Sequence, residues 1–176
     1  DRQMKRPALI VAATDMLPPP EYLLEVNRKA QVILVLDGME TDTQMLEQAG
    51  LRVVRHWTAL GLGRAVKSGL NELLNDFPGC TGALIASTAR PLPLSLIDAM
   101  AGALERHPMS LSLGIAPVTE QTPRRQAKER IWAARLFSVI NGTKLSDIRP
   151  ALRAVPASLL GHYAVSPGEG EDYLLN

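Results

Sequence analysis

Two short segments of the chain combine residue types that bind nucleotides or phosphates. Asp37-Gly38 follows the apolar run 32–36, and a fixed carboxylate there accepts hydrogen bonds from base N–H and sugar hydroxyl groups. Gly61-Leu62-Gly63-Arg64 opens a predicted helix, where the missing side chains let backbone N–H groups approach a phosphate. Both segments also have a structural interpretation, because Asp-Gly makes turns and glycine permits close packing. The two interpretations stay open.

A basic group near the middle of the chain is a second candidate for phosphate binding. Arg124, Arg125 and Lys128 surround the start of a predicted helix over residues 125–140. Such side chains hold phosphate through charge-assisted hydrogen bonds, so we assign them to the phosphate or acceptor side of a site. Long cationic side chains are equally typical of a solvated helix face.

Other chemistries find little support in the sequence. The three histidines, His56, His107 and His162, lack the close spacing of a zinc pair, and no Gly-x-Ser-x-Gly segment indicates a hydrolase. Cys80 is the one cysteine and cannot form an intrachain disulfide, which is typical of a reducing compartment. We therefore predict no metal site and a cytoplasmic location.

Composition indicates one globular domain. The chain has 176 residues, of which 46% are hydrophobic and 21% charged, which is an ordinary globular balance. A net charge of +1 makes nucleic acid an unexpected partner. No run approaches the roughly 18 apolar residues of a membrane-spanning helix. We expect residues 1–176 to form a single domain, cut from a longer protein because the chain starts without Met.

The order of the predicted elements positions these residues. Strands alternate with helices, which predicts an α/β fold with a mostly parallel, doubly wound sheet flanked by helices. Ligands bind such sheets beyond the carboxyl ends of the strands. In the helix over 63–77, one buried face is predicted from Val66, Leu70, Leu73, Leu74 and Phe77. The predicted strands are 8–13, 31–36, 52–55, 83–86 and 110–115, and the helices are 21–29, 41–49, 63–77, 94–106 and 125–140.

Three segments carry a resemblance to a known family. Residues 36–42 resemble its Asp-Asp-Gly-Ser-Thr-Asp segment, and Gly61-Leu62-Gly63-Arg64-Ala65 is similar to its Gly-Lys-Gly-Ala-Ala. Residues 141–156 are similar to Thr-Gly-x-Lys-x-Ser-Asp-x-Gln-Thr-Gly-Leu-Arg-Ala-Ile-Pro. From Ala8 onward the chain thus resembles the family-two glycosyltransferases of the GT-A type, nucleotide-diphospho-sugar transferase-like enzymes, above all the dolichyl- and polyprenyl-phosphate sugar transferases.

The resemblance implies a set of site residues and partners. It implies a UDP- or GDP-sugar donor, a polyprenyl phosphate acceptor and a place at the cytoplasmic face of the membrane. By resemblance, Asp147 is the acidic residue near the acceptor, although a turn- or helix-capping role remains open for it. The nucleotide-binding positions would be Thr14, Asp37, Gly38, Gly61, Gly63 and Arg64.

One departure from the family decides how the resemblance is interpreted. Where the family has Asp-Ala-Asp-Gly-Gln, this chain has Ser87-Thr88-Ala89-Arg90-Pro91, so both metal-binding carboxylates are missing. In the family they hold Mg²⁺ or Mn²⁺ against the nucleotide diphosphate. We therefore expect no metal cofactor, and we expect this degenerate metal site to lie beside Asp37.

Two functions remain open, and with them whether the chain is an enzyme. The first is a degenerate glycosyltransferase-like domain, a pseudoenzyme that acts as a binding or regulatory module with a nucleotide sugar, polyprenyl phosphate or protein partner. The second is an active, metal-independent glycosyltransferase in which Arg90, with Arg64, supplies the positive charge of the ion. An ordinary dinucleotide-binding domain is set aside, because residues 13–18 contain no glycine-rich loop.

Overall fold

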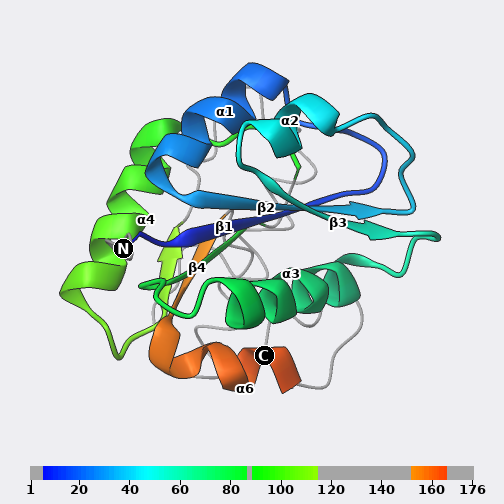
Figure 1. The fold of residues 1–176 in the computed structure, drawn as a ribbon. Coiled ribbons are helices and arrows are strands. Elements are labelled where there is room, and N and C mark those ends of the chain that lie inside the picture. Colours follow the sequence, from blue (N-terminus) through cyan, green and yellow to red (C-terminus); the bar gives the residue numbers. More distant parts are fainter. Residues whose placement is uncertain (1–5, 87–88, 115–151, 166–176) are drawn as a thin grey trace, which may run out of the picture.

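The computed structural model describes residues 6–86, 89–114 and 152–165, and within these residues six strands form one sheet (Figure 1). The strands are β1 (Ala8–Ala13), β2 (Gln31–Asp37), β3 (Arg52–His56), β4 (Gly82–Ala86), β5 (Ser112–Gly114) and β6 (Leu152–Pro156). The helices are α1 (Pro20–Lys29), α2 (Gln44–Gln48), α3 (Leu62–Asp76), α4 (Leu94–Arg106) and α6 (Leu160–Val165), and a 3₁₀ turn, η1 (Ala157–Leu159), precedes α6.

The sheet has the order β3-β2-β1-β4-β6-β5. Its first four strands are parallel, and β6 is antiparallel to both β4 and β5. The usual dinucleotide-binding sheet has the order 3-2-1-4-5-6. Here a reversed strand lies between β4 and β5, so the fold is α/β and mostly parallel, as predicted, but it is not that of a dinucleotide-binding domain.

The central strands form because their residues are apolar and β-branched and are buried on both faces. Every residue of β2 is buried, and so is every residue of β4. Along β1 the side chains alternate: Leu9 and Val11 pack on one side of the sheet, Ala8 and Ile10 on the other. Continuous burial of this kind is typical of a parallel sheet with helices on both faces.

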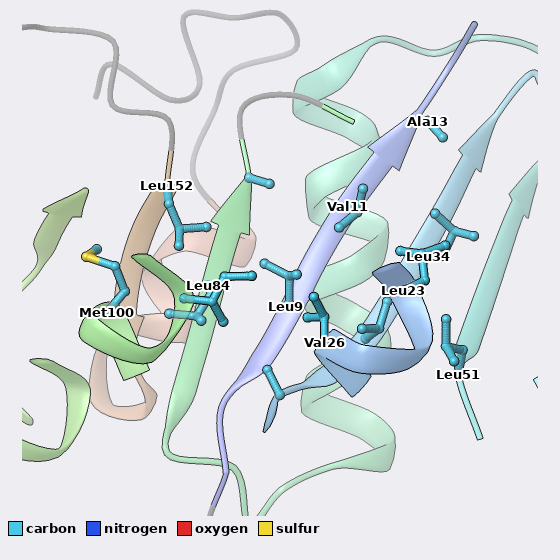
Figure 2. Packing of buried hydrophobic residues seen from close by; sticks show 14 of the residues in the cluster. Leu9, Val11, Ala13, Leu23, Val26, Leu34, Leu51, Leu84, Met100 and Leu152 are labelled. Carbon is cyan, nitrogen blue, oxygen red and sulfur yellow. The ribbon is translucent and has the colours of Figure 1, made fainter. Parts of the chain in front are cut away.

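Helices cover the two faces of the sheet unequally. Figure 1 shows α1, α2 and α4 on one side and α3 with α6 on the other. On the first side, Leu23 and Val26 of α1 lie beside the strand residues Leu9 and Leu34 (Figure 2). Met100 of α4 lies near Leu84 and Leu152 in the same view. On the second side, the buried stripe of α3 packs against β1 and β2. The two hydrophobic cores hold the strand ends in fixed positions.

Several predicted boundaries were wrong. The helix predicted over 41–49 is limited to Gln44–Gln48, with Thr43 as its N-cap residue, and the Asp42 carboxylate before it accepts a hydrogen bond from Gln44 N–H. The strand predicted over 110–115 begins only at Ser112, and Ile115 lies outside the described residues. Leu74 lies off the buried face of α3 and is 40% exposed. The strand β6 and the helix α6 were not predicted, and the helix predicted over 125–140 lies outside the described residues.

The close approach of α3 to β1 yields a test of the fold. A Cβ atom added to Gly69 would lie 2.6 Å from Ile10 Cγ2. We expect Gly69→Ala to lower the free energy of unfolding by about 1–2 kcal/mol, because overpacking outweighs the better helix propensity of alanine. Urea denaturation measures the change.

Gly102→Ala, in α4, is the matched control. A Cβ atom there would meet the end of the flexible Arg106 side chain at 2.9 Å, so we expect unchanged or slightly higher stability. Equal effects of the two substitutions would contradict the packing of α3 on β1.

Candidate functional site

The carboxyl ends of four parallel strands meet at one edge of the sheet, which we call the carboxyl edge. It is formed by the ends of β1, β2, β3 and β4 and the residues that follow them. Asp37 ends β2, and β4 ends at Ala86 on the same edge, with β1 between the two strands. In open α/β sheets this is the edge where ligands bind, so it is the candidate site.

Asp37 is the most constrained polar residue at the carboxyl edge. Its side chain is 1% exposed. Oδ1 accepts hydrogen bonds from Leu60 N–H at 2.8 Å and pairs with His56 Nδ1 at 2.8 Å, and Oδ2 accepts one from Gly61 N–H at 2.9 Å. Both carboxylate oxygens are thus engaged within the protein. The carboxylate holds the loop that connects β3 to α3.

The environment of Asp37 keeps the carboxylate ionised. Burial, the largest single influence, raises the pKa of Asp37. Hydrogen bonds from Leu60 N–H, His56 and Gly61 N–H act in the opposite direction and together bring the pKa below its ordinary value. The charge that the loop requires is therefore present at neutral pH.

His56 links Asp37 to helix α3. Its Nδ1 faces Asp37, its Nε2 lies 2.8 Å from Ser68 Oγ, and its side chain is only 10% exposed. The order of these contacts, from aspartate through histidine to serine, is that of a hydrolytic triad. Ser68, however, lies in the middle of α3, where backbone N–H groups are committed to the helix and cannot form an oxyanion hole. The three side chains therefore act as a link between β2, β3 and α3.

Two glycines let the loop fold back over the end of β2. Gly38 has a φ of 74°, and a Cβ atom there would lie 2.4 Å from Ala59 N. Its N–H donates to His56 O at 3.2 Å. Gly61, with a φ of 94°, is the residue that caps the start of α3. The structural roles that the sequence left open for Gly38 and Gly61 are both present.

The remaining predicted nucleotide-binding residues are accessible to different degrees. Thr14, after β1, and Arg64, in the first turn of α3, are exposed, while Gly63 is buried. No side chain caps the start of α3, so N–H groups of its first turn face the loop without a side-chain acceptor. The loop also carries Trp57, which is fully exposed, and Leu60, which is 42% exposed.

The segment after β4 is described only in part. Ala89 packs against the first core, Arg90 is exposed, and Leu92 N–H donates to the Tyr22 hydroxyl at 2.9 Å, which ties this segment to α1. Ser87 and Thr88 lie outside the described residues, as do Asp147, Arg124, Arg125 and Lys128, so the structure does not place them. Within the part of the chain that is described, no group of three or more His, Cys, Asp or Glu residues is arranged to hold a metal ion.

His56 and Ser68 were not predicted as members of the site. They are 12 residues apart in the sequence and belong to different elements. The available signal was the position of His56 at the end of a strand next to Asp37-Gly38, because parallel strands bring such residues together.

Among the described helices, none is long and apolar enough to cross a membrane.

The role of Asp37 yields a pH-dependent prediction. We expect Asp37→Asn to lower the free energy of unfolding by about 2–4 kcal/mol at pH 7, because the amide leaves buried donors without an anionic acceptor. The folded-state pKa of Asp37 is lowered, so its contribution is fully present above the unfolded value of about 4 and is lost as pH falls through the folded value.

The stability difference between wild type and Asp37→Asn should therefore shrink as the pH is lowered from 5 to 2 in urea titrations. Asp98→Asn is the control, because Asp98 forms an exposed pair with Lys29 and should change stability by less than about 1 kcal/mol. A difference that grows in acid would show that Asp37 does not stabilise the loop as an anion.

Comparison with known proteins finds similarity among solved structures. No protein-family model matches this chain, and no curated protein sequence matches it either. A solved structure described as a crystal structure of 4-diphosphocytidyl-2C-methyl-D-erythritol synthase is similar, with a TM-score of 0.48 and 13% sequence identity. The likeness covers 93% of this chain and 79% of the other. Membership of the family-two glycosyltransferases remains a prediction from the motifs.

Proposed function

We propose that this chain is a glycosyltransferase-like domain of the nucleotide-diphospho-sugar transferase type that binds its ligand at the carboxyl edge and acts as a binding or regulatory module. The observation that carries the proposal is the internal use of Asp37. Its two carboxylate oxygens are occupied by Leu60, Gly61 and His56. The acidic residue that the motif resemblance assigns to the nucleotide thus stabilises the loop instead.

The chemistry of the strand ends argues against family-type metal catalysis. Mg²⁺ and Mn²⁺ in such sites require carboxylate oxygens. The segment after β4 offers Ser87, Thr88 and Ala89, whose side chains include no anionic oxygen. Asp37 is buried and already bonded. These residues do not fit a divalent ion, so no catalytic step is assigned to one.

Features that favour ligand binding remain at the same edge. The start of α3 is uncapped by side chains, and helix N-termini favour anions such as phosphate. Arg64 and Arg90 are exposed and positively charged. The exposed apolar side chains of Trp57 and Leu60 are typical of contact surfaces. A nucleotide sugar is the favoured ligand, with polyprenyl phosphate or a protein as a further partner at the cytoplasmic face of the membrane.

Calorimetric titration with UDP, GDP, a UDP-sugar and a GDP-sugar tests the proposal, with either Mn²⁺ or EDTA present. We expect binding that Mn²⁺ changes less than about twofold and no release of nucleoside diphosphate from the sugar nucleotides. Restoring the family's carboxylates by Ser87→Asp together with Ala89→Asp should make binding depend on Mn²⁺, because the added oxygens can coordinate the ion.

Each alternative gives a different result when the same nucleotides are tested both for binding and for release of nucleoside diphosphate. Mn²⁺-dependent turnover by the wild type would overturn the proposal. Turnover that is unchanged in EDTA and lost in Arg90→Ala would favour the active, metal-independent enzyme, with Arg90 in place of the ion. An absence of binding to all four nucleotides would leave polyprenyl phosphate or another protein as the partner.

A further inference from the structure

Arg153 is a buried cation whose charge the fold does not explain. It lies on β6 and is 6% exposed, although arginine is seldom buried without a partner. Its Nε atom is buried and has no hydrogen-bond partner. A buried N–H without an acceptor is costly, so this group is expected to have an acceptor in the functional state.

The register of the sheet places Arg153 close to the carboxyl edge. It pairs with Ile85 of β4, the last residue but one of that strand, and with Leu113 of β5. Ile85 and Val155 both pack in the core under α3 and α6, and side chains alternate along a strand, so Arg153 lies on this face of the sheet. Only Ala86 separates its partner Ile85 from the end of β4, so Arg153 lies near this edge of the sheet.

No described acidic residue compensates the charge. Among residues 6–86, 89–114 and 152–165, ion pairs join cations such as Lys29, Arg52 and Arg55 to carboxylates of other elements, but no ion pair with Arg153 is found there. Taking a cation out of water without a counter-ion is strongly unfavourable. A guanidinium in this position is therefore suited to an anion from outside the described fold.

We propose that Arg153 is the cationic group of a phosphate subsite at the carboxyl edge, next to the end of β4. A guanidinium binds two phosphate oxygens side by side, and this geometry would satisfy the free Nε. The subsite deepens the proposed function and rests on it: since no carboxylates after β4 can hold a metal ion, the phosphate charge would be met by the buried arginine of the neighbouring strand β6.

The same chemistry fits two sources of phosphate, a nucleoside diphosphate and a polyprenyl monophosphate. Inorganic pyrophosphate, UDP, GDP and farnesyl monophosphate separate them when each is titrated calorimetrically in EDTA. Tighter binding of pyrophosphate and the nucleotides assigns the subsite to the donor, and tighter binding of farnesyl monophosphate assigns it to the acceptor. Either ranking supports a phosphate subsite only if it depends on Arg153.

The decisive variant is Arg153→Met, which keeps the length and apolar packing of the side chain and removes its charge. In phosphate-free buffer we expect its unfolding temperature to equal or exceed that of the wild type, because an uncompensated buried charge has been removed. We expect affinity for the preferred phosphate probe to fall about tenfold or more, since charged hydrogen bonds are lost. Arg153→Lys should lose part of the affinity, because it keeps the charge without the paired donors.

Arg28→Met is the matched control, since Arg28 is exposed in the last turn of α1 and should not affect binding. An Arg153→Met protein that is less stable than wild type but binds the probes equally well would overturn the inference and indicate a counter-ion within the chain. No binding of any phosphate probe by the wild type would also overturn it. If nucleotides bind in EDTA with an affinity that Arg153→Met does not change, the phosphate subsite is wrong and the proposed function stands. If the wild type turns over sugar nucleotides with Mn²⁺ and needs Arg153 for it, the proposed function is wrong and the subsite stands.

Discussion

The carboxylate of Asp37 is the interaction on which the carboxyl edge depends. A single buried anion accepts two backbone N–H groups of one loop and pairs with the imidazole at the end of the neighbouring strand. Without it, Leu60 N–H and Gly61 N–H would lose their acceptor, and the β3–α3 loop would lose its hydrogen bonds to the end of β2. Burial of a charge is tolerated here because its acceptor positions are used.

This use of Asp37 changes how the motif resemblance is interpreted. An aspartate and a glycine at the end of β2 resemble a nucleotide-binding segment, yet the same two residues are also required for the loop to fold. Asp37 is bonded on both oxygens, and Gly38 leaves room for Ala59. Retention of these residues therefore does not by itself indicate sugar transfer. Arg153, which lies in the motif-like segment 141–156 but received no role there, has a buried Nε without a hydrogen-bond partner.

The sequence predicted the fold better than the site. The bounds of β1 and α4 were predicted correctly, because buried apolar runs and helical spacing leave local signals. The strand β6 was missed because Arg153 and Pro156 interrupt its apolar pattern, and its place beside β4 depends on contacts distant in the sequence. The link from Asp37 through His56 to Ser68 was missed for the same reason: it joins three elements that only the folded sheet and helix bring together.

Hydrogen exchange at the amides of the β3–α3 loop tests the central claim most directly. Measured by NMR on the wild type at neutral pH, the Leu60 and Gly61 amides should exchange far more slowly than those of Thr58 and Ala59, because only the first two donate to the buried Asp37 carboxylate. Exchange of all four amides at the same fast rate would show that Asp37 does not hold the loop, and the account of the carboxyl edge would then be wrong.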